Sequence, residues 1–538
     1  MKRNVKGSVA YFCMEYGLQS DFKIYAGGLG ILAGDYLKGA KDGDYPIVGI
    51  GIKWKQGYTK QVIQSDGTPV DTYPIYSYDF LDDTGVTVDI KIRKRNVQCK
   101  VWKCTQFGNV DLYLLDTDMK ENDDPWITGQ LYGWFGEQRI AQEMVLGVGG
   151  VRALRKLGIH VDRYHFNEGH ALFAGFELIR EKIEKGLSFE AAWQASKEEI
   201  VFTTHTPVLQ GNESHPIDRI MYMGANMGLS RSQLRKLGGR PFNMTVGGLR
   251  LAKRSNAVAQ LHGETANKMW RHVLGDSEII GITNGIHLPT WVDTKMLQAA
   301  EKDDTSIWDQ HQENKTKLIS FIEKKSGAKL DVDRLLIGFS RRAVPYKRSD
   351  LIFHNPKIID PLLKEGKVQI VFSGKGHPLD DAGKAIVSRL VTMQKKYPDA
   401  VVFLADYNME IGAMLTRGSD IWLNNPRRPK EASGTSGMKA AMNGVLNLSI
   451  LDGWWPEACQ HGINGWQIGD ENIPSSEKEQ DKKDGKALYE VLLDDVLPTY
   501  YDNRPKWIQM MRASIKSTRN KFSVERMLEE YYKLLYRS

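Results

Sequence analysis

The chain has 538 residues, 41% of them hydrophobic and 26% charged, which is typical of a soluble globular protein with more than one domain. Its net charge of +7 suits a small anionic substrate but is too low for the dense basic face of a nucleic-acid-binding protein. The four cysteines form no Cys-x-x-Cys pair, which favours a reducing compartment. No apolar run approaches the roughly 20 residues that a membrane span needs. We therefore expect a cytoplasmic protein that binds neither nucleic acid nor membrane.

The N-terminal part alternates strands and helices around a glycine loop. A strand-like run at 9–15 is followed by Gly27–Gly30 (Gly-Gly-Leu-Gly) and by an apparent helix at 31–41. Glycines at such a place allow a backbone to approach a phosphate closely, although the pattern alone is more often a tight turn. Further strands are expected at 45–54, 86–92 and 110–116, and a helix with apolar residues at helical spacing is expected at 136–157.

Two polar turns follow strands in the middle of the chain. The run 162–170 reads as a strand that ends in a turn with Glu168 and His170. Its histidines and glutamate suggest a metal site at first sight, but their spacing is not a known ligand pattern, so metal is the weaker interpretation. The strand at 199–205 ends at His205, where doubly wound sheets place ligand contacts, although a lone histidine there is more often structural.

The second half of the chain begins with a charged segment and leads to a cluster of cations. After a strand at 278–283, the partly helical segment 296–329 is expected to link two domains. The buried-type strand 334–340 is followed by four cations within eight residues: Arg341, Arg342, Lys347 and Arg348. Such cations are costly to hold together without an anion.

Buried-type strands and helices continue to alternate toward the C-terminus. Strands are expected at 368–373, 401–406, 420–425 and 445–451, and this alternation predicts a parallel sheet. The mixed-charge run 475–486 is expected to be a solvated loop. A long helical stretch at 488–535 is expected to close the chain.

The segment 431–439 (Glu-Ala-Ser-Gly-Thr-Ser-Gly-Met-Lys) carries the sharpest chemical signal. A small-residue turn opens an apolar helix, and such turns present backbone N–H groups to an anion. Lys439, on the first helical turn, can lose its proton in a partly apolar pocket and condense with an aldehyde. The residues alone leave a second interpretation open, which is a tightly packed βα loop with a solvated lysine.

Glu-Ala-Ser-Gly-Thr-x-x-Met-Lys resembles the pyridoxal phosphate lysine segment of the glycogen/α-glucan phosphorylases, and family-like segments run from residue 10 to about residue 460 in the family's order. The resemblance implies an α/β protein with two Rossmann-like doubly wound domains facing across a cleft, the B-type glycosyltransferase fold. Residues 1–300 would bind glucan and phosphate. Residues 301–538 would bind pyridoxal phosphate and carry a closing C-terminal helix. Because family-like sequence begins near the start, we expect a short form without the N-terminal regulatory extension.

The resemblance also implies the site residues. Pyridoxal 5′-phosphate would form a Schiff base with Lys439, and its other contacts would come from Thr435, Ser436, Arg341, Tyr407 and Trp291. The catalytic residues would be Lys439, Arg341, Arg342, Lys347 and His205. The substrate-binding residues would be Gly28, Glu168, His170, His205, Asn284, Glu431, Ser433 and Gly434. No metal is expected.

The chain departs from the family pattern at four positions. Arg341 stands where the family has lysine, and Glu168 stands where it has aspartate. His287 and Thr290, on either side of a short turn before Trp291, also differ from the family. Arg341 keeps the positive charge, but its planar guanidinium cannot reproduce the geometry of a lysine ammonium. Contacts through these positions are therefore expected to differ in detail.

The function that the resemblance implies is retaining phosphorolysis of the terminal α-1,4-linked glucose of glycogen, starch or maltodextrin. The products would be α-D-glucose 1-phosphate and a shortened glucan, with the cofactor 5′-phosphate as proton relay. The family favours homodimers. An alternative is a retaining nucleotide-sugar glucosyltransferase of the glycogen/starch synthase type, which lacks a lysine at the place of Lys439.

A second alternative, from a different class, is a carbohydrate-binding relative that has lost activity. The complete phosphate set of Gly28, Arg342, Lys347 and Lys439 argues against it. Pyridoxal enzymes of the transaminase kind are the least favoured, because their lysine lies in a different sequence context. The sequence therefore predicts an α-glucan phosphorylase.

Overall fold

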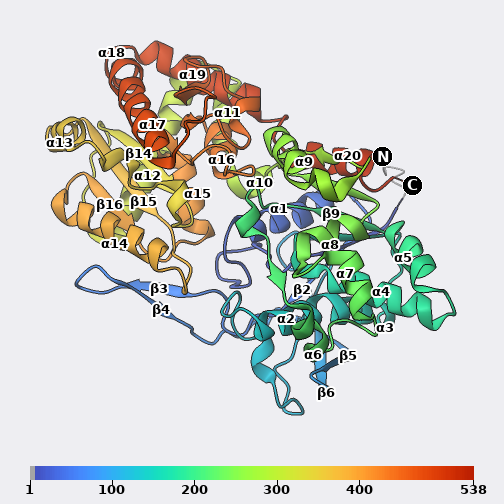
Figure 1. Ribbon diagram of the computed structural model, residues 1–538. Helices are drawn as coiled ribbons and strands as arrows, with labels where there is room; N and C mark the ends of the chain where they lie inside the picture. Colours follow the sequence, from blue (N-terminus) through green and yellow to red (C-terminus); the bar gives the residue numbers. More distant parts are fainter. Residues whose placement is uncertain (1–6, 538) are drawn as a thin grey trace. The chain divides into compact units, whose positions relative to one another are not determined.

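The computed structural model describes residues 7–537, which form two compact units (Figure 1). Unit 1 takes the described residues up to Thr59, then Tyr73–Thr283 and the segment from Val524 onward. Unit 2 takes Lys60–Thr72 and Asn284–Ser523. These units differ from the predicted ranges 1–300 and 301–538: the second begins earlier, and the last helix belongs to unit 1.

Unit 1 contains a nine-stranded sheet in the order β13-β12-β9-β8-β1-β2-β7-β6-β5. The strands are β1 (Val9–Phe12), β2 (Ile47–Ile52), β5 (Asp82–Ile92), β6 (Arg95–Cys104), β7 (Leu112–Asp116), β8 (Arg163–Asn167), β9 (Ile200–Thr203), β12 (Arg254–Ala257) and β13 (Ile279–Gly281). Neighbouring strands are parallel from β13 to β7, and β6 and β5 extend the sheet antiparallel. The strands expected at 9–15, 45–54, 86–92 and 110–116 are confirmed as β1, β2, β5 and β7.

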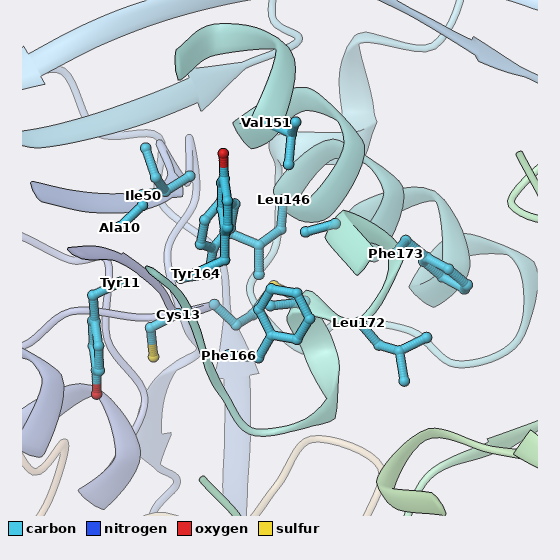
Figure 2. Packing of buried hydrophobic residues seen from close by; sticks show 14 of the residues in the cluster. Ala10, Tyr11, Cys13, Ile50, Leu146, Val151, Tyr164, Phe166, Leu172 and Phe173 are labelled. Carbon is cyan, nitrogen blue, oxygen red and sulfur yellow. The ribbon is translucent and has the colours of Figure 1, made fainter. Parts of the chain in front are cut away.

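Helices pack on this sheet because their apolar faces and the buried strands together form one core. They include α1 (Gly28–Asp42), α2 (Glu137–Met144), α3 (Gly150–Lys156), α4 (Phe173–Glu184), α5 (Phe189–Lys197), α6 (Ile217–Met223), α7 (Arg231–Gly238), α8 (Met244–Leu251), α9 (Gln260–Leu274) and α20 (Val524–Leu534). Figure 2 shows Ala10, Tyr164 and Phe166 of the strands packed with Leu146 and Val151 of the helical layer. The helix expected at 136–157 is confirmed as α2 and α3, joined by a π-helical turn.

Unit 2 contains a six-stranded sheet in the order β16-β15-β14-β17-β18-β19, in which all neighbours are parallel. The strands are β14 (Leu335–Ser340), β15 (Val368–Ser373), β16 (Val401–Leu404), β17 (Ile421–Asn424), β18 (Leu446–Ile450) and β19 (Gly465–Ile468). The chain runs outward from β14 to β16 and then returns to β17 on the other side of β14. The boundary between β14 and β17 is therefore the topological switch point of this sheet.

The helices of unit 2 correct three expectations. They include α10 (Leu288–Trp291), α11 (Thr294–Ala300), α12 (Asp304–Ser326), α13 (Pro356–Lys364), α14 (Asp381–Lys396), α15 (Met409–Gly418), α16 (Ser436–Met442), α17 (Glu477–Val491), α18 (Leu497–Asp502) and α19 (Arg504–Thr518). The segment 296–329, expected as a linker, was wrongly assigned, because α12 buries Ile307, Leu318 and Ile322 in unit 2.

The expected solvated loop at 475–486 is also wrong, because α17 begins at Glu477, with Ser476 accepting a hydrogen bond from the backbone N–H of Glu479. The long helical stretch expected at 488–535 is broken instead into several helices, one of which begins at Arg504 after the cap residue Asn503. A short hairpin of β3 (Lys60–Ile63) and β4 (Pro69–Thr72) completes unit 2. Within the described part of the chain, no helix is long and apolar enough to cross a membrane.

Candidate functional site

The carboxyl edge of the unit 2 sheet gathers most of the predicted site residues. Strand β14 ends at Ser340 and leads directly to Arg341, while β17 ends at Asn424 and leads to the loop that carries Glu431. Because β14 and β17 are parallel neighbours, their carboxyl ends meet at the switch point. Ligands of doubly wound sheets bind at such a point.

Glu431 lies between two cations at this edge. Its Oε2 is 2.6 Å from Lys347 Nζ and 2.8 Å from Arg341 Nη2, and all three side chains are buried. Burial alone would raise the pKa of Glu431, but the charges of Arg341 and Lys347 outweigh burial and hold this pKa at about 2. Glu431 is therefore a carboxylate that accepts hydrogen bonds and carries no proton at neutral pH.

Asp452 fixes the turn after Glu431. The oxygens of its carboxyl group accept hydrogen bonds from the backbone N–H of Glu431 at 2.9 Å and of Gly453 at 2.8 Å. The carbonyl oxygen of Ser433 accepts from the backbone N–H of Trp454 at 2.9 Å, and a Cβ on Gly453 would lie 2.1 Å from that oxygen. Burial raises the pKa of Asp452 to about 8. Sequence reasoning missed this residue, although its place directly after a buried strand is a usable signal.

Lys439 lies on α16 with its amine against an aromatic ring. Lys439 is 4% exposed, and its Nζ is 3.4 Å from the centroid of the Trp291 ring. The carbonyl oxygen of Trp291 accepts hydrogen bonds from Arg417 Nε at 3.0 Å and from Asn443 Nδ2 at 3.2 Å, which fixes this residue. The alternative interpretation, in which Lys439 is solvated, is therefore excluded.

The remaining predicted residues of unit 2 differ in exposure. Thr435 occupies the N-cap position of α16 without a side-chain capping hydrogen bond, and the Ser436 hydroxyl accepts a hydrogen bond from Trp422 Nε1 at 3.2 Å. Tyr407 follows β16; burial raises its pKa to about 12, and the nearby charge of Arg341 opposes this shift. Asn284 and Ser433 are buried, and Gly434 adopts a φ of +73°, which favours glycine. The side chain of Arg342, in contrast, is exposed.

Unit 1 brings Glu168 and His205 together at the carboxyl ends of β8 and β9. Glu168 accepts hydrogen bonds from the backbone N–H groups of His205 at 2.7 Å and Gly169 at 3.2 Å, and from Thr206 Oγ1 at 3.2 Å. His205 Nε2 lies 2.6 Å from Asn167 Oδ1. An amide oxygen can only accept, so Nε2 carries a hydrogen.

The histidines of this group are neutral. Burial, with a smaller contribution from the charge of His262, lowers the pKa of His205 to about 3. Burial, helped by the nearby Arg139, lowers the pKa of His170 to about 3 as well. The buried Nδ1 of His170 has no hydrogen-bond partner among the described residues, and an orphaned ring nitrogen of this kind suits a ligand hydroxyl.

The glycine loop of unit 1 is organised by Glu15, which sequence reasoning missed. Glu15 Oε2 accepts hydrogen bonds from the backbone N–H groups of Ala26 at 2.6 Å and Gly27 at 3.0 Å. A Cβ on Gly30 would lie 2.5 Å from the same oxygen, whereas a Cβ on Gly28 would meet no atom within 4 Å. The backbone at Gly28, the first residue of α1, is therefore open to a ligand.

Of the described residues, Glu143, Glu213 and His215 form the one group with metal-ligand chemistry, their ligand atoms lying within 4.8 Å of one another. Burial raises the pKa of Glu143 to about 8 and that of Glu213 to about 7, so these two carboxyls can share a proton. Arg139 Nε lies 3.5 Å from Glu213 and balances the remaining charge. None of the predicted site residues belongs to this group.

A doubly wound sheet with two buried cations, a buried lysine and an ionised carboxylate at its switch point places the protein among α/β enzymes and is suited to an anionic ligand. Residues 278–472 match the family model described as carbohydrate phosphorylase. Maltodextrin phosphorylase of Thermococcus litoralis is 38% identical over 98% of this chain and 70% of its own length. Glycogen phosphorylase of Aquifex aeolicus is 36% identical over 99% of this chain and 86% of its own length.

An uncharacterized protein of Methanocaldococcus jannaschii is 36% identical over 98% of this chain and 99% of its own length. The chain belongs to the carbohydrate phosphorylase family. The predicted family and the predicted α/β fold class are confirmed.

Proposed function

We propose that this protein is an α-glucan phosphorylase. It transfers the terminal α-1,4-linked glucose of a glycogen-, starch- or maltodextrin-type glucan to inorganic phosphate and releases α-D-glucose 1-phosphate. The observation that carries the proposal is the buried Arg341–Glu431–Lys347 group at the switch point that also carries Lys439. The relatives named maltodextrin phosphorylase and glycogen phosphorylase support the same reaction.

The residues of unit 2 fit pyridoxal phosphate. Lys439 offers a buried amine for the aldehyde of the cofactor, and the Trp291 ring beside it offers an apolar surface. Arg341, Thr435 and Ser436 would hold the 5′-phosphate, because a guanidinium and hydroxyl groups are suitable partners for phosphate oxygens. Tyr407 would lie near the same 5′-phosphate, because its pKa responds to the nearby charge of Arg341. When bound, this cofactor supplies a second phosphate that can give and take a proton.

Lys347 and Arg342 would hold the substrate phosphate. In the structure Arg341 and Lys347 share the carboxylate of Glu431, which holds both cations in place. Arg342 is exposed and can turn toward a ligand. Two phosphates repel one another, and three cations offset this repulsion. In unit 1, the backbone N–H of Gly28 is proposed as a further phosphate contact.

The sugar would be held by acceptors and neutral groups. Glu431 and the turn at Ser433 and Gly434 are proposed to accept or donate hydrogen bonds to its hydroxyls, with Asn284 beside them. His205, His170 and Glu168 are proposed for the same task in unit 1. Because Glu431 has a pKa of about 2 and His205 one of about 3, neither can donate a proton at neutral pH. A phosphate is proposed as the donor of the proton for the glycosidic oxygen.

The test is a spectrum of the purified protein, before and after borohydride, with peptide mapping of the reduced adduct. A pyridoxal band that becomes fixed to Lys439, together with phosphate-dependent release of glucose 1-phosphate from maltodextrin, is expected. Transfer of glucose from a nucleotide sugar without any pyridoxal band would favour the synthase alternative. A cytoplasmic location and a homodimer remain predictions of the sequence and of the family resemblance.

A further inference from the structure

Arg348, the residue after Lys347, is a buried connection between the two loops of the switch point. It is 2% exposed, and its Nε and Nη2 donate hydrogen bonds to the carbonyl oxygens of Asn425 and Pro426, each at 2.8 Å. In return, Asn425 Nδ2 donates to the carbonyl oxygen of Arg348 at 3.1 Å. The loop after β14 and the loop after β17 are thus joined by both backbone and side-chain groups.

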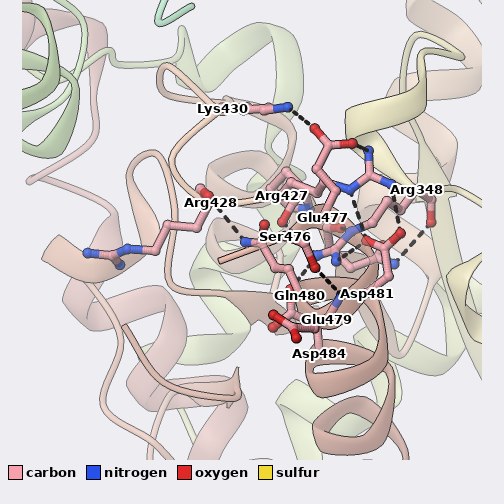
Figure 3. A network of polar contacts seen from close by, with 12 residues as sticks. Arg348, Arg427, Arg428, Lys430, Ser476, Glu477, Glu479, Gln480, Asp481 and Asp484 are labelled. Carbon is pink, nitrogen blue, oxygen red and sulfur yellow. Dashed lines mark hydrogen bonds and ion pairs between the residues drawn. The ribbon is translucent and has the colours of Figure 1, made fainter. Parts of the chain in front are cut away.

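Helix α17 supplies the negative charges for this connection. Arg348 Nη1 lies 3.0 Å from Asp481 Oδ1, and Arg348 Nη2 lies 2.8 Å from Asp484 Oδ2. Arg427, on the loop after β17, donates to both oxygens of Asp481, at 2.9 Å from Nε and 2.7 Å from Nη2. Figure 3 shows Asp481 facing both arginines. One carboxylate of α17 therefore binds one arginine from each loop.

The two loops held in this way carry Lys347 and Glu431, which are both proposed to bind substrate. Lys347 precedes Arg348, and Glu431 follows Arg427 by four residues; the backbone N–H of Arg427 also donates to the carbonyl oxygen of Tyr346 at 2.8 Å. The Lys347 Nζ to Glu431 Oε2 distance of 2.6 Å depends on how these loops lie against each other. Small displacements of a positioned group are costly for a reaction.

We propose that Asp481, acting through Arg348 and Arg427, is a positioning residue for Lys347 and Glu431 and so tunes the binding of phosphate. This inference rests on the proposed phosphorolysis and extends it to a helix that bears none of the proposed site residues. Asp481 remains ionised in this setting: burial would raise its pKa, but hydrogen bonds from Arg427 and Arg348 outweigh burial and lower it.

The same helix provides a matched control. Glu490, on the same helix, pairs with Lys486 at the molecular surface: Lys486 Nζ lies 3.5 Å from Glu490 Oε1, and their side chains are 78% and 57% exposed. Exposed ion pairs of this kind contribute little, because water and salt screen them. Removing the charge of Glu490 changes the same helix without touching Arg348 or Arg427.

The experiment compares Asp481→Asn with Glu490→Gln in the 538-residue chain, loaded with pyridoxal phosphate. We expect Asp481→Asn to raise the KM for inorganic phosphate roughly tenfold and to lower kcat, since a displaced binding group costs about one to two orders of magnitude. Glu490→Gln stays within about twofold of the wild type. Amide hydrogen exchange of peptides covering 425–434 is expected to accelerate in Asp481→Asn alone.

The outcomes separate the two proposals. A wild type without phosphorolysis contradicts the proposed function, whereas an active wild type and an Asp481→Asn variant with unchanged KM and kcat contradict the positioning role. A merely structural role would lower the unfolding midpoint and leave KM unchanged well below that midpoint. If Asp481→Asn does not fold, Arg427→Gln, which leaves the Arg348 contacts to Asp481 and Asp484 in place, is expected to raise the KM for phosphate in the same direction. An unchanged KM there overturns the inference.

Discussion

The carboxyl ends of the parallel strands carry different chemistry in the two sheets. In unit 2, between β14 and β17, two buried cations converge on the ionised carboxylate of Glu431. In unit 1, the strand order changes direction between β1 and β8. The groups beyond β8 and β9 are neutral histidines and a carboxylate that accepts hydrogen bonds from backbone N–H groups.

This difference teaches that two sheets of similar plan can present different chemistry beyond their carboxyl ends. Cations are good partners for a phosphate, and unit 2 holds Arg341 and Lys347 on the carboxylate of Glu431. Uncharged donors and acceptors can bind sugar hydroxyls, and burial keeps His170 and His205 uncharged in unit 1. The variants below therefore change the buried ion pairs of unit 2 and the uncharged histidines of unit 1.

The largest effect is expected from Lys439→Ala. Without its amine, unit 2 loses the group proposed to hold pyridoxal phosphate, and we expect phosphorolysis to fall at least about 1000-fold, because the cofactor carries the chemistry that side chains cannot supply. The measurement is glucose 1-phosphate release together with the absorbance of bound pyridoxal. Lys430→Ala, at a partly exposed lysine in the loop after β17, should retain both. Full activity of the Lys439→Ala protein would refute the proposal.

Glu431→Gln is expected to have the next largest effect, because it leaves Arg341 and Lys347 buried without a countercharge. Removing one partner of a buried ion pair costs about 3–5 kcal/mol of unfolding free energy, and kcat/KM should fall about 100-fold.

The pH dependence of this stability difference has a defined sign. The folded pKa of Glu431 is about 2, below an unfolded value of about 4.3, so its contribution is complete above about pH 4.3 and is lost as the pH falls toward 2. Denaturant unfolding of wild type and Glu431→Gln between pH 2 and pH 7 should therefore show a difference in unfolding free energy that becomes smaller in acid. A difference that does not depend on pH would contradict the assigned ion pair.

His205→Gln tests the role of the uncharged histidine beyond β9. Its amide can still donate to Asn167, but the ring is lost, and we expect kcat/KM to fall roughly 10- to 100-fold with the change mainly in the KM for glucan. The folded pKa of His205 is about 3, below an unfolded value of about 6.5, so the stability it contributes is complete above about pH 6.5 and is lost as the pH falls toward 3. Wild type should lose more unfolding free energy than His205→Gln over that range; equal losses would show a charged His205.

The smallest effect is expected in the glycine loop of unit 1. Gly30→Ala places a Cβ 2.5 Å from Glu15 Oε2 and should lower the unfolding free energy by about 1–3 kcal/mol. Gly28→Ala meets open space and should leave stability within about 0.5 kcal/mol, while raising the KM for phosphate if its backbone approaches that ligand. Equal unfolding midpoints for the two variants would contradict the packing of Glu15 against this loop.

The sequence predicted the parts of the fold that depend on local pattern. Buried strands such as 334–340 and the turn at 431–439 could be predicted, because burial and turn chemistry depend on neighbouring residues. Glu15 and Asp452 were missed, because their partners are backbone N–H groups that no motif reveals. The run 475–486 was wrongly predicted to be a loop. Its many charges obscure the pattern of an amphipathic helix, and its partner Arg348 lies far away in the sequence. The Ser476-x-x-Glu479 pattern is a capping signal that could have found α17.

The most direct test of the central claim follows the anomeric carbon. The purified protein, loaded with pyridoxal phosphate, is incubated with maltodextrin and inorganic phosphate, and the products are observed by ³¹P and ¹H NMR. The account predicts α-D-glucose 1-phosphate, in an amount that depends on phosphate, from the wild type and none from Lys439→Ala. Free glucose or a β-configured ester, or glucose transfer that requires a nucleotide sugar, would contradict it.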